Sequence, residues 1–93
     1  MIEQHIEIIN RLGLHARAAA KLVDCAARFG SQIRISRLDE HTDSPVDAKS
    51  IMSVMMLAAG KGSTLTIMAE GKDEAEAISA LVELISNRFG EPD

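Results

Sequence analysis

Residues 64–89, TLTIMAEGKDEAEAISALVELISNRF, contain a strand pattern followed directly by an amphipathic helix pattern. Apolar side chains occupy every second position of residues 64–70, which is typical of a strand with one buried face. Beyond the turn, apolar residues recur at helical spacing up to Phe89, and Asp73 with Glu76 resembles a capping box at the helix start. Because the apolar face of such a strand must be covered, this segment predicts a helix packed on a sheet.

The rest of the chain repeats these two patterns. We expect strands at residues 2–9, 32–36, 46–48 and 64–70, and helices at residues 16–29, 51–58 and 73–89. Gly30 lies where a left-handed helix cap is expected, and Arg28 falls in the last turn of the preceding helix. Pro45 ends a turn-rich loop over 39–45 and restricts residues 46–48 to an edge strand or a strand start.

The order of these elements predicts an α+β fold. Three amphipathic helices can cover one face of a four-stranded antiparallel sheet and leave the other face in water. We therefore expect a two-layer open-faced sandwich with the order βαββαβα. A chain of 93 residues has room for one core, so residues 1–93 are expected to form a single domain.

Composition excludes several classes of function. The net charge of −4 argues against non-specific binding of nucleic acid or of anionic membranes, since both need a basic surface. No apolar stretch approaches the roughly 20 residues of a membrane span, so no membrane insertion is expected. The lone Cys25 cannot form an internal disulfide, and together with the absence of a signal segment it favours a cytoplasmic protein. His5, His15, His41 and Cys25 lack metal-ligand spacing, so no metal is expected. The sequence also has no glycine-rich phosphate loop for ATP, and no cofactor is expected.

The segment Gly13-Leu14-His15-Ala16-Arg17 is the strongest candidate for chemistry. It places His15 at the start of a predicted helix and Arg17 within the first turn. The free N–H groups at a helix N-terminus bind anions, and an adjacent guanidinium supplies charged donors for phosphate oxygens. An imidazole at this position is a competent nucleophile near neutral pH. The alternative is that His15 is a surface residue or a weak helix cap.

A second segment, Asp47-Ala48-Lys49-Ser50-Ile51-Met52, opens the short helix predicted over residues 51–58. Ser50 is a good N-cap, which would account for it on structural grounds alone. The helix carries more apolar surface, at Ile51, Met52, Met55 and Met56, than one face can bury. Exposed methionines adapt to several partners, whereas the alternative is a Met-rich core.

The two segments together carry a resemblance to a known family. The first resembles the phosphorylated-histidine motif of HPr, the histidine-containing phosphocarrier of the bacterial phosphoenolpyruvate:sugar phosphotransferase system. The second resembles the regulatory-serine segment of the same family, and the two lie at the expected separation. The order of predicted elements also matches the open-faced sandwich of that family.

This resemblance implies a cytoplasmic phosphocarrier, which is a substrate in a relay rather than a turnover enzyme. His15 would accept a phosphoryl group on Nδ1 from phosphorylated enzyme I and pass it to an enzyme IIA domain. The helix N-terminus at Ala16, Arg17 and Ala18 would bind the phosphate, with Arg17 steadying it during transfer. The family usually has Pro where this chain has Ala18, which puts the lifetime of the phosphohistidine and the rate of transfer in doubt.

The same resemblance implies regulation and docking. Ser50 would be phosphorylated by HPr kinase/phosphorylase where that enzyme is present. The partner-docking surface would include Lys21, Lys49, Ile51, Met52 and Met55, and the protein is expected to be a monomer. Two alternatives remain, namely the nitrogen-branch paralogue of HPr and a regulatory binding module that passes on no phosphate.

Overall fold

An open antiparallel sheet with helices on one face makes up the computed structural model, which describes residues 1–38 and 45–92. The sheet has the order β1-β4-β2-β3 and consists of β1 (Ile2–Glu7), β2 (Gln32–Arg37), β3 (Val46–Asp47) and β4 (Thr64–Glu70). The helices are α1 (Ala16–Ala27), α2 (Ile51–Met56) and α3 (Glu74–Ser86), followed by a 3₁₀ turn, η1 (Arg88–Gly90). The predicted α+β open-faced sandwich and its element order are confirmed.

The sheet separates an apolar face from a polar face. Ile33, Ile35, Leu65 and Ile67 alternate along the two inner strands, and each is fully buried. The outer face carries the exposed His5 on the edge strand β1. The alternation predicted from the sequence therefore decides which side of each strand meets the helices.

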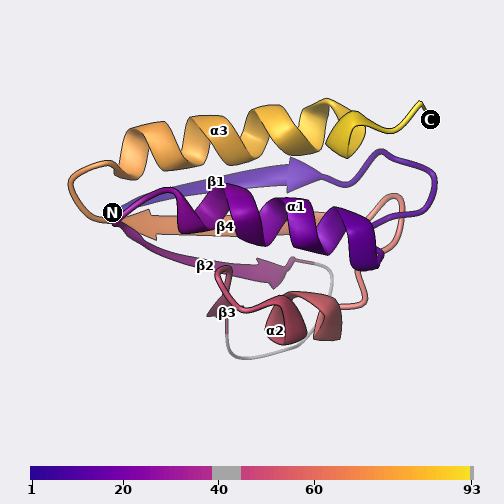
Figure 1. Cartoon of the computed structure of the whole chain (residues 1–93), viewed down its shortest axis with the longest axis horizontal. Coiled ribbons are helices and arrows are strands. Elements are labelled where there is room, and N and C mark those ends of the chain that lie inside the picture. The colour runs from indigo at the N-terminus through magenta and orange to yellow at the C-terminus, as the bar shows by residue number, and fades with distance from the viewer. Residues whose placement is uncertain (39–44, 93) are drawn as a thin grey trace.

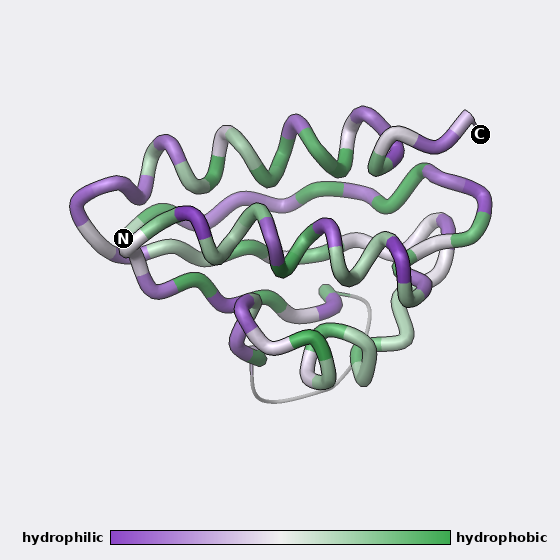
Figure 2. Tube along the Cα trace, viewed as in Figure 1, coloured by the Kyte–Doolittle hydropathy of each residue, from purple (hydrophilic) through white to green (hydrophobic). Residues whose placement is uncertain are grey.

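The helices α1 and α3 run antiparallel to one another across the apolar face of the sheet (Figure 1). Their buried residues recur every three or four positions, as expected for amphipathic helices. They are Ala18, Ala19, Leu22, Cys25 and Ala26 in α1, and Ala77, Ile78, Leu81 and Ile85 in α3. The short helix α2 lies beside α1, buries Val54 and carries mostly apolar residues (Figures 1 and 2).

Several predicted boundaries are wrong by one to three residues. The first strand ends at Glu7 rather than at residue 9, although Ile8 still pairs by backbone hydrogen bonds with the segment at 62–63. The short helix ends at Met56 rather than at residue 58, because Ala58 takes a left-handed conformation with φ of 51°. Most of the loop predicted over 39–45, including His41, lies outside the described residues. The edge position of residues 46–47 is confirmed.

The left-handed cap predicted at Gly30 is wrong, and the capping box predicted at the start of α3 does not form, although Asp73 is the N-cap residue there. Gly30 is not left-handed, because α1 already ends at Ala27 with Arg28 as its C-cap. Asp73 makes no side-chain cap to α3. Its carboxylate instead accepts hydrogen bonds from the N–H groups of Gly30 and Ser31, at 2.9 and 3.0 Å, and from the Ser31 hydroxyl. The two predicted capping residues therefore meet each other across the fold.

This contact makes part of the stability depend on pH. The Ser31 hydroxyl, together with the Gly30 and Ser31 N–H groups, holds the pKa of Asp73 below its ordinary value despite partial desolvation. When the pKa of a carboxyl is lower in the folded than in the unfolded chain, the carboxyl stabilises the fold fully above its unfolded pKa, near 4. This stabilisation is lost as the pH falls through the folded pKa. We expect Asp73→Asn to lose less stability between pH 6 and pH 3 than the wild type, measured by urea unfolding. Asp24→Asn, at an exposed carboxyl on α1, should behave like the wild type; equal pH dependence of Asp73→Asn and wild type would contradict the assignment.

Candidate functional site

A tight turn before α1 sets the position of His15. The side-chain amide of Asn10, which is fully buried, donates to the carbonyl of Gly13 at 2.8 Å. The N–H of Gly13 in turn donates to the carbonyl of Asn10 at 3.1 Å. These two hydrogen bonds close the loop between β1 and α1, so the backbone enters the helix along a defined path.

The same loop is fastened to the segment that follows α2. The N–H of Leu14 donates to the carbonyl of Ala59 at 2.8 Å. Gly13 has a φ of +68°, and a Cβ at this position would lie 2.7 Å from the Cα of Gly60. Only glycine meets both requirements, because the left-handed conformation and the backbone contact each exclude a side chain. The histidine loop and the end of α2 therefore form one unit.

His15 is the N-cap residue of α1, as predicted. Its backbone is extended, with ψ of −179°, and its carbonyl accepts the first helical bond from the N–H of Ala19 at 2.8 Å. The N–H groups of Ala16, Arg17 and Ala18 precede that bond, so the helix itself does not use them. The side chain of Arg17 is exposed and that of Ala18 is fully buried. This end of α1 has no acidic residue in its first turn, which suits an anion.

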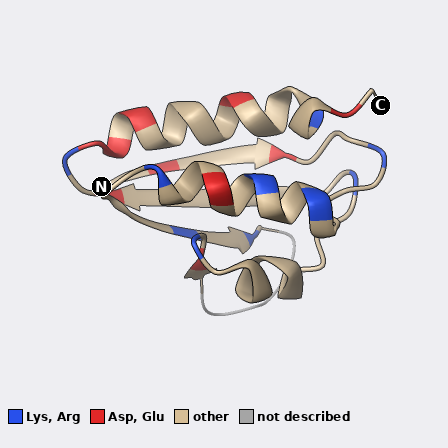
Figure 3. Ribbon diagram, in the orientation of Figure 1, with Lys and Arg blue, Asp and Glu red and all other residues tan. Residues whose placement is uncertain are grey.

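Basic residues gather at this end of the molecule. Figure 3 shows lysine and arginine in the first half of α1 and in the loop before it, whereas α2 has no charged residue. Arg17 borders a shallow depression beside His15, and its other lining residues are Arg11, Leu12, Glu91 and Pro92. The depression beside the imidazole is therefore lined by two arginines and one glutamate, and its arginines favour an anionic ligand.

Two residues of the site, Asn10 and Glu91, are not indicated by any pattern in the sequence. One carboxylate oxygen of Glu91 contacts Nε2 of His15, and the other accepts from the Asn10 amide at 2.9 Å. Desolvation raises the pKa of Glu91, but the hydrogen bonds from Asn10 and His15 and the charges of His15 and Lys21 outweigh it, so the pKa lies below its ordinary value. Glu91 is 76 positions from His15, so no local pattern signals the contact.

Ser50 is the N-cap of α2, as predicted, and its hydroxyl accepts from the N–H of Ser53 at 3.4 Å. A serine cap of this kind contributes about 1 kcal/mol to stability. The apolar residues that follow are exposed rather than part of a Met-rich core, with Met52 at 69% and Met56 at 80% of full exposure. Ile51 and Met55 are also exposed. An apolar, uncharged helix surface therefore lies beside the basic end of α1.

The two lysines predicted to border the docking surface both make backbone contacts. The ammonium of Lys21 donates to the carbonyl of Phe89 at 2.6 Å, and that of Lys49 donates to the carbonyl of Phe29 at 2.7 Å. Lys21 therefore links α1 to the turn after α3. Lys49 likewise links the start of α2 to the end of α1. Their role in docking stays a prediction.

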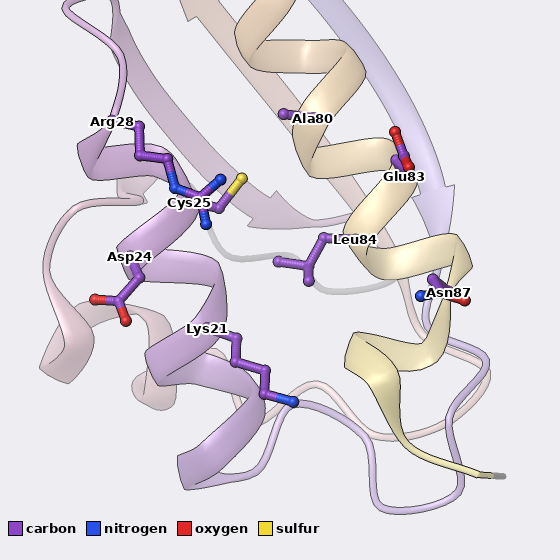
Figure 4. A pocket seen from close by; sticks show the side chains of 8 residues that line it. All are labelled: Lys21, Asp24, Cys25, Arg28, Ala80, Glu83, Leu84 and Asn87. Carbon is purple, nitrogen blue, oxygen red and sulfur yellow. The ribbon is translucent and has the colours of Figure 1, made fainter.

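A groove between α1 and α3 lies apart from the histidine site (Figure 4). Residues of both charge signs line it, including Asp24 on α1, Arg28 at the C-cap of α1 and Glu83 on α3. Cys25 is buried there; burial raises the pKa of its thiol, although Arg28 lowers it in part. His15, Arg17 and Ser50 take no part in this groove.

In residues 1–38 and 45–92, no cluster of three His, Cys, Asp or Glu could hold a metal ion, and no helix is long and apolar enough to cross a bilayer.

Comparison with known proteins identifies the family. Residues 2–87 match the model of the PTS-HPr family, described as the PTS HPr component phosphorylation site. The chain belongs to the HPr family. HPr proteins are phosphocarriers of the phosphotransferase system and act as carriers rather than turnover catalysts.

Individual HPr proteins resemble the chain over nearly its whole length. The phosphocarrier protein HPr of Cupriavidus necator is 57% identical over 98% of each chain. The phosphocarrier protein HPr of Pseudomonas aeruginosa is 60% identical over 92% of each chain. The crystal structure of an HPr from Thermoanaerobacter tengcongensis superimposes with a TM-score of 0.90, at 48% identity and with complete coverage of both chains. Sequence and fold therefore point to the same family.

Proposed function

We propose that this HPr protein carries a phosphoryl group on His15 between two proteins of the phosphotransferase system. Phosphorylated enzyme I, charged from phosphoenolpyruvate, is the donor, and an enzyme IIA domain is the acceptor. The protein acts in the cytoplasm, as a monomer and a single domain. The observation that carries the proposal is the position of His15, which caps α1 beside the unpaired first-turn N–H groups and the exposed Arg17.

The geometry supports transfer by positioning and charge. A phosphoryl group attached to His15 would lie near the N–H groups of Ala16, Arg17 and Ala18 and near the Arg17 guanidinium. These donors neutralise the charge that spreads over the phosphoryl oxygens during transfer. The Asn10 and Gly13 contacts hold the loop still, so little ordering is left to the moment of reaction. Ala18 leaves one more donor free at this position than Pro would.

Intact-mass analysis tests the proposal directly. The wild-type protein is mixed with enzyme I, Mg²⁺ and phosphoenolpyruvate, and we expect one phosphoryl adduct that is lost in acid, as a phosphoramidate should be. A reaction without enzyme I controls for direct chemistry, and another HPr shows that the enzyme I is active. An unmodified protein beside an active enzyme I would overturn the proposal and favour the regulatory binding module. Phosphorylation only by an enzyme I of a nitrogen branch would favour that paralogue.

Arg17→Ala should slow phosphotransfer and leave the fold unchanged. The side chain is exposed in the first turn of α1, and alanine is a good helix former, so little stability is at risk. The variant loses one charged hydrogen-bond donor to the phosphoryl group, which should reduce the rate of phosphotransfer by roughly a hundredfold. Rapid-quench measurement of transfer from enzyme I gives this rate. Arg28→Ala removes the same charge at the far end of α1 and should retain wild-type kinetics; matching rates for the two variants would remove Arg17 from the site.

We also propose that Ser50 is a regulatory phosphorylation site for an HPr kinase/phosphorylase. Supporting this, Ser50 caps a helix whose exposed face bears Ile51, Met52 and Met55 beside the His15 loop. Phosphate at a helix N-terminus is compatible with the helix dipole. It would place negative charge on the surface by which enzyme I and the IIA domain dock, and Lys21 and Lys49 would border that surface.

Ser50→Asp should therefore slow transfer from enzyme I without unfolding α2. Aspartate is itself a good N-cap, so it replaces the serine cap while adding a negative charge. We expect a reduction of roughly tenfold at low salt, which shrinks as added salt screens the charge. Ser79→Asp adds the same charge to an exposed position on α3 and serves as the matched control. Equal transfer rates for Ser50→Asp and Ser79→Asp would count against a regulatory effect of charge at Ser50.

A further inference from the structure

The carboxylate of Glu91 uses both oxygens at the histidine site. One oxygen contacts Nε2 of His15, and the other accepts from the buried amide of Asn10 at 2.9 Å. Only 12% of the Glu91 side chain is exposed. Asn10 also fixes the carbonyl of Gly13, so one amide connects the carboxylate to the loop that carries the histidine. Glu91 lies four residues beyond residue 87, the last one that the family model matches.

The turn that carries Glu91 is held against the body of the molecule. Phe89 is almost fully buried, and its carbonyl accepts the Lys21 ammonium at 2.6 Å. Figure 4 shows Lys21 extending from α1 toward this turn. The N–H of Glu91 donates to the carbonyl of Arg88 at 2.9 Å, which closes the turn locally. An apolar anchor, a charged clamp and a backbone bond therefore fix the carboxylate beside the imidazole.

The chemistry of this contact determines which ring nitrogen is free to react. Glu91 is ionised at neutral pH, and an ionised carboxylate can only accept hydrogen bonds. The shared proton must therefore belong to Nε2. In the neutral imidazole the other nitrogen, Nδ1, then carries the lone pair. Among the residues that the structure describes, none forms a hydrogen bond with Nδ1.

We propose that Glu91 is a positioning residue, which holds the proton on Nε2 of His15 and thereby directs phosphoryl attachment to Nδ1. The inference rests on the proposed phosphocarrier function and adds the group that orients its nucleophile. It assigns a role to a side chain from the C-terminal turn, which the histidine motif does not contain. Glu91 acts through His15 and touches no transferred atom.

Phosphoryl transfer to and from Nδ1 requires no proton to leave the imidazole, so no proton acceptor is needed. The Nδ1 lone pair forms the bond to phosphorus, and the bond between phosphorus and the donor breaks, with its electron pair leaving on the donor. The imidazole becomes positively charged while its proton stays on Nε2, facing the Glu91 carboxylate. When the acceptor protein attacks phosphorus, the Nδ1–P bond breaks and its electrons return to the ring. The imidazole is then neutral again, with the same proton in place.

The first measurement uses the unphosphorylated protein. With ¹⁵N-labelled histidine, we expect Nε2 of His15 to carry a proton that exchanges with water more slowly than the ring protons of the exposed His5. This resonance should remain in Glu91→Gln, whose amide oxygen can still accept, and disappear in Glu91→Ala. Glu76→Ala removes an exposed carboxylate from α3 and is the matched control. Thermal unfolding should show that all three variants remain folded.

The second measurement reads the site of phosphorylation directly. Phosphoramidate phosphorylates imidazole nitrogens without any protein donor, breaking its own P–N bond and releasing ammonia. In a His5→Ala/His41→Ala background, which leaves His15 as the sole histidine of the chain, we expect attachment at Nδ1. Glu91→Ala should lower the ratio of Nδ1 to Nε2 adducts by roughly tenfold, as expected for losing one hydrogen bond to a charged group. Glu91→Gln should restore most of the selectivity.

The outcomes separate this inference from the proposed function. Reaction of the wild-type His15 at Nε2 as readily as at Nδ1 would overturn it, and so would unchanged selectivity in Glu91→Ala. Neither measurement uses enzyme I. A protein that shows the Glu91-dependent selectivity but accepts no phosphoryl group from enzyme I would refute the carrier function and leave the role of Glu91 intact.

Discussion

His15→Ala is expected to abolish phosphorylation by enzyme I completely. The substitution removes the imidazole nucleophile while leaving the backbone free to continue into α1, because the N-cap contact of residue 15 is made by its carbonyl. No other side chain at this end of α1 offers a nucleophile of comparable reactivity. Intact-mass analysis with enzyme I, Mg²⁺ and phosphoenolpyruvate measures the result as the fraction of protein that carries the adduct.

His5→Ala is the matched control for this experiment. His5 is an exposed histidine on the outer face of the sheet, where its ring contacts Glu3 at 3.3 Å. His5 lies within β1 rather than at a helix N-terminus, so its removal should leave phosphorylation at the wild-type level. An adduct that persists in His15→Ala and disappears in His5→Ala would show that His5, rather than His15, carries the phosphoryl group. Urea unfolding of both variants excludes loss of the fold as the cause.

Gly13→Ala is expected to damage both the stability and the site. The residue must remain at a φ of +68°, and its new Cβ would meet the backbone of Ala59 and Gly60 at 2.8 and 2.7 Å. Left-handed strain and an overlap with backbone that cannot turn away together cost about 2–5 kcal/mol. Relief of the overlap would pull the loop from the end of α2 and break the hydrogen bond from Leu14 to Ala59. We therefore expect a large loss of unfolding free energy and a slower phosphotransfer.

Gly30→Ala is the matched control, because it replaces a glycine at a position where neither the backbone conformation nor a close contact requires one. A Cβ at Gly30 would meet no atom within 4 Å, and the backbone there is not left-handed. Its unfolding free energy should stay within about 0.5 kcal/mol of the wild-type value. Urea denaturation measures both variants. Similar stabilities for Gly13→Ala and Gly30→Ala would show that the histidine loop can move away from α2 at little cost.

Local sequence patterns predicted the elements well and their ends less well. Ile33 and Ile35 alternate with polar residues, and this alone indicates a strand with one buried face. Gly30 is not the left-handed cap that was predicted, and Asp73 is the N-cap residue of α3 but makes no side-chain cap, because its carboxylate bonds to residues far away in the chain. Asp73 accepts from Gly30 and Ser31 more than 40 positions earlier, and that contact replaces the local cap.

In the candidate site, too, the sequence predicted the local features and missed the long-range contacts. The motif around His15 predicted its place at the start of α1 and the nearness of Arg17, since both follow from short-range helix geometry. Ser50 was likewise predicted as an N-cap from its neighbours alone. Asn10 and Glu91 were missed, because nothing near an asparagine or a glutamate indicates that it will meet a histidine from another part of the chain.

By itself, the sequence determined the element types, the buried face of each element and the histidine at a helix N-terminus. Each of these depends on periodicities of two or 3.6 residues, or on chemistry within a single helical turn. The tertiary structure alone decided that Gly13 lies against Gly60 and that the C-terminal turn brings Glu91 to Nε2 of His15. Such contacts depend on how whole elements pack, and packing energy is a property of the assembled core rather than of any short segment.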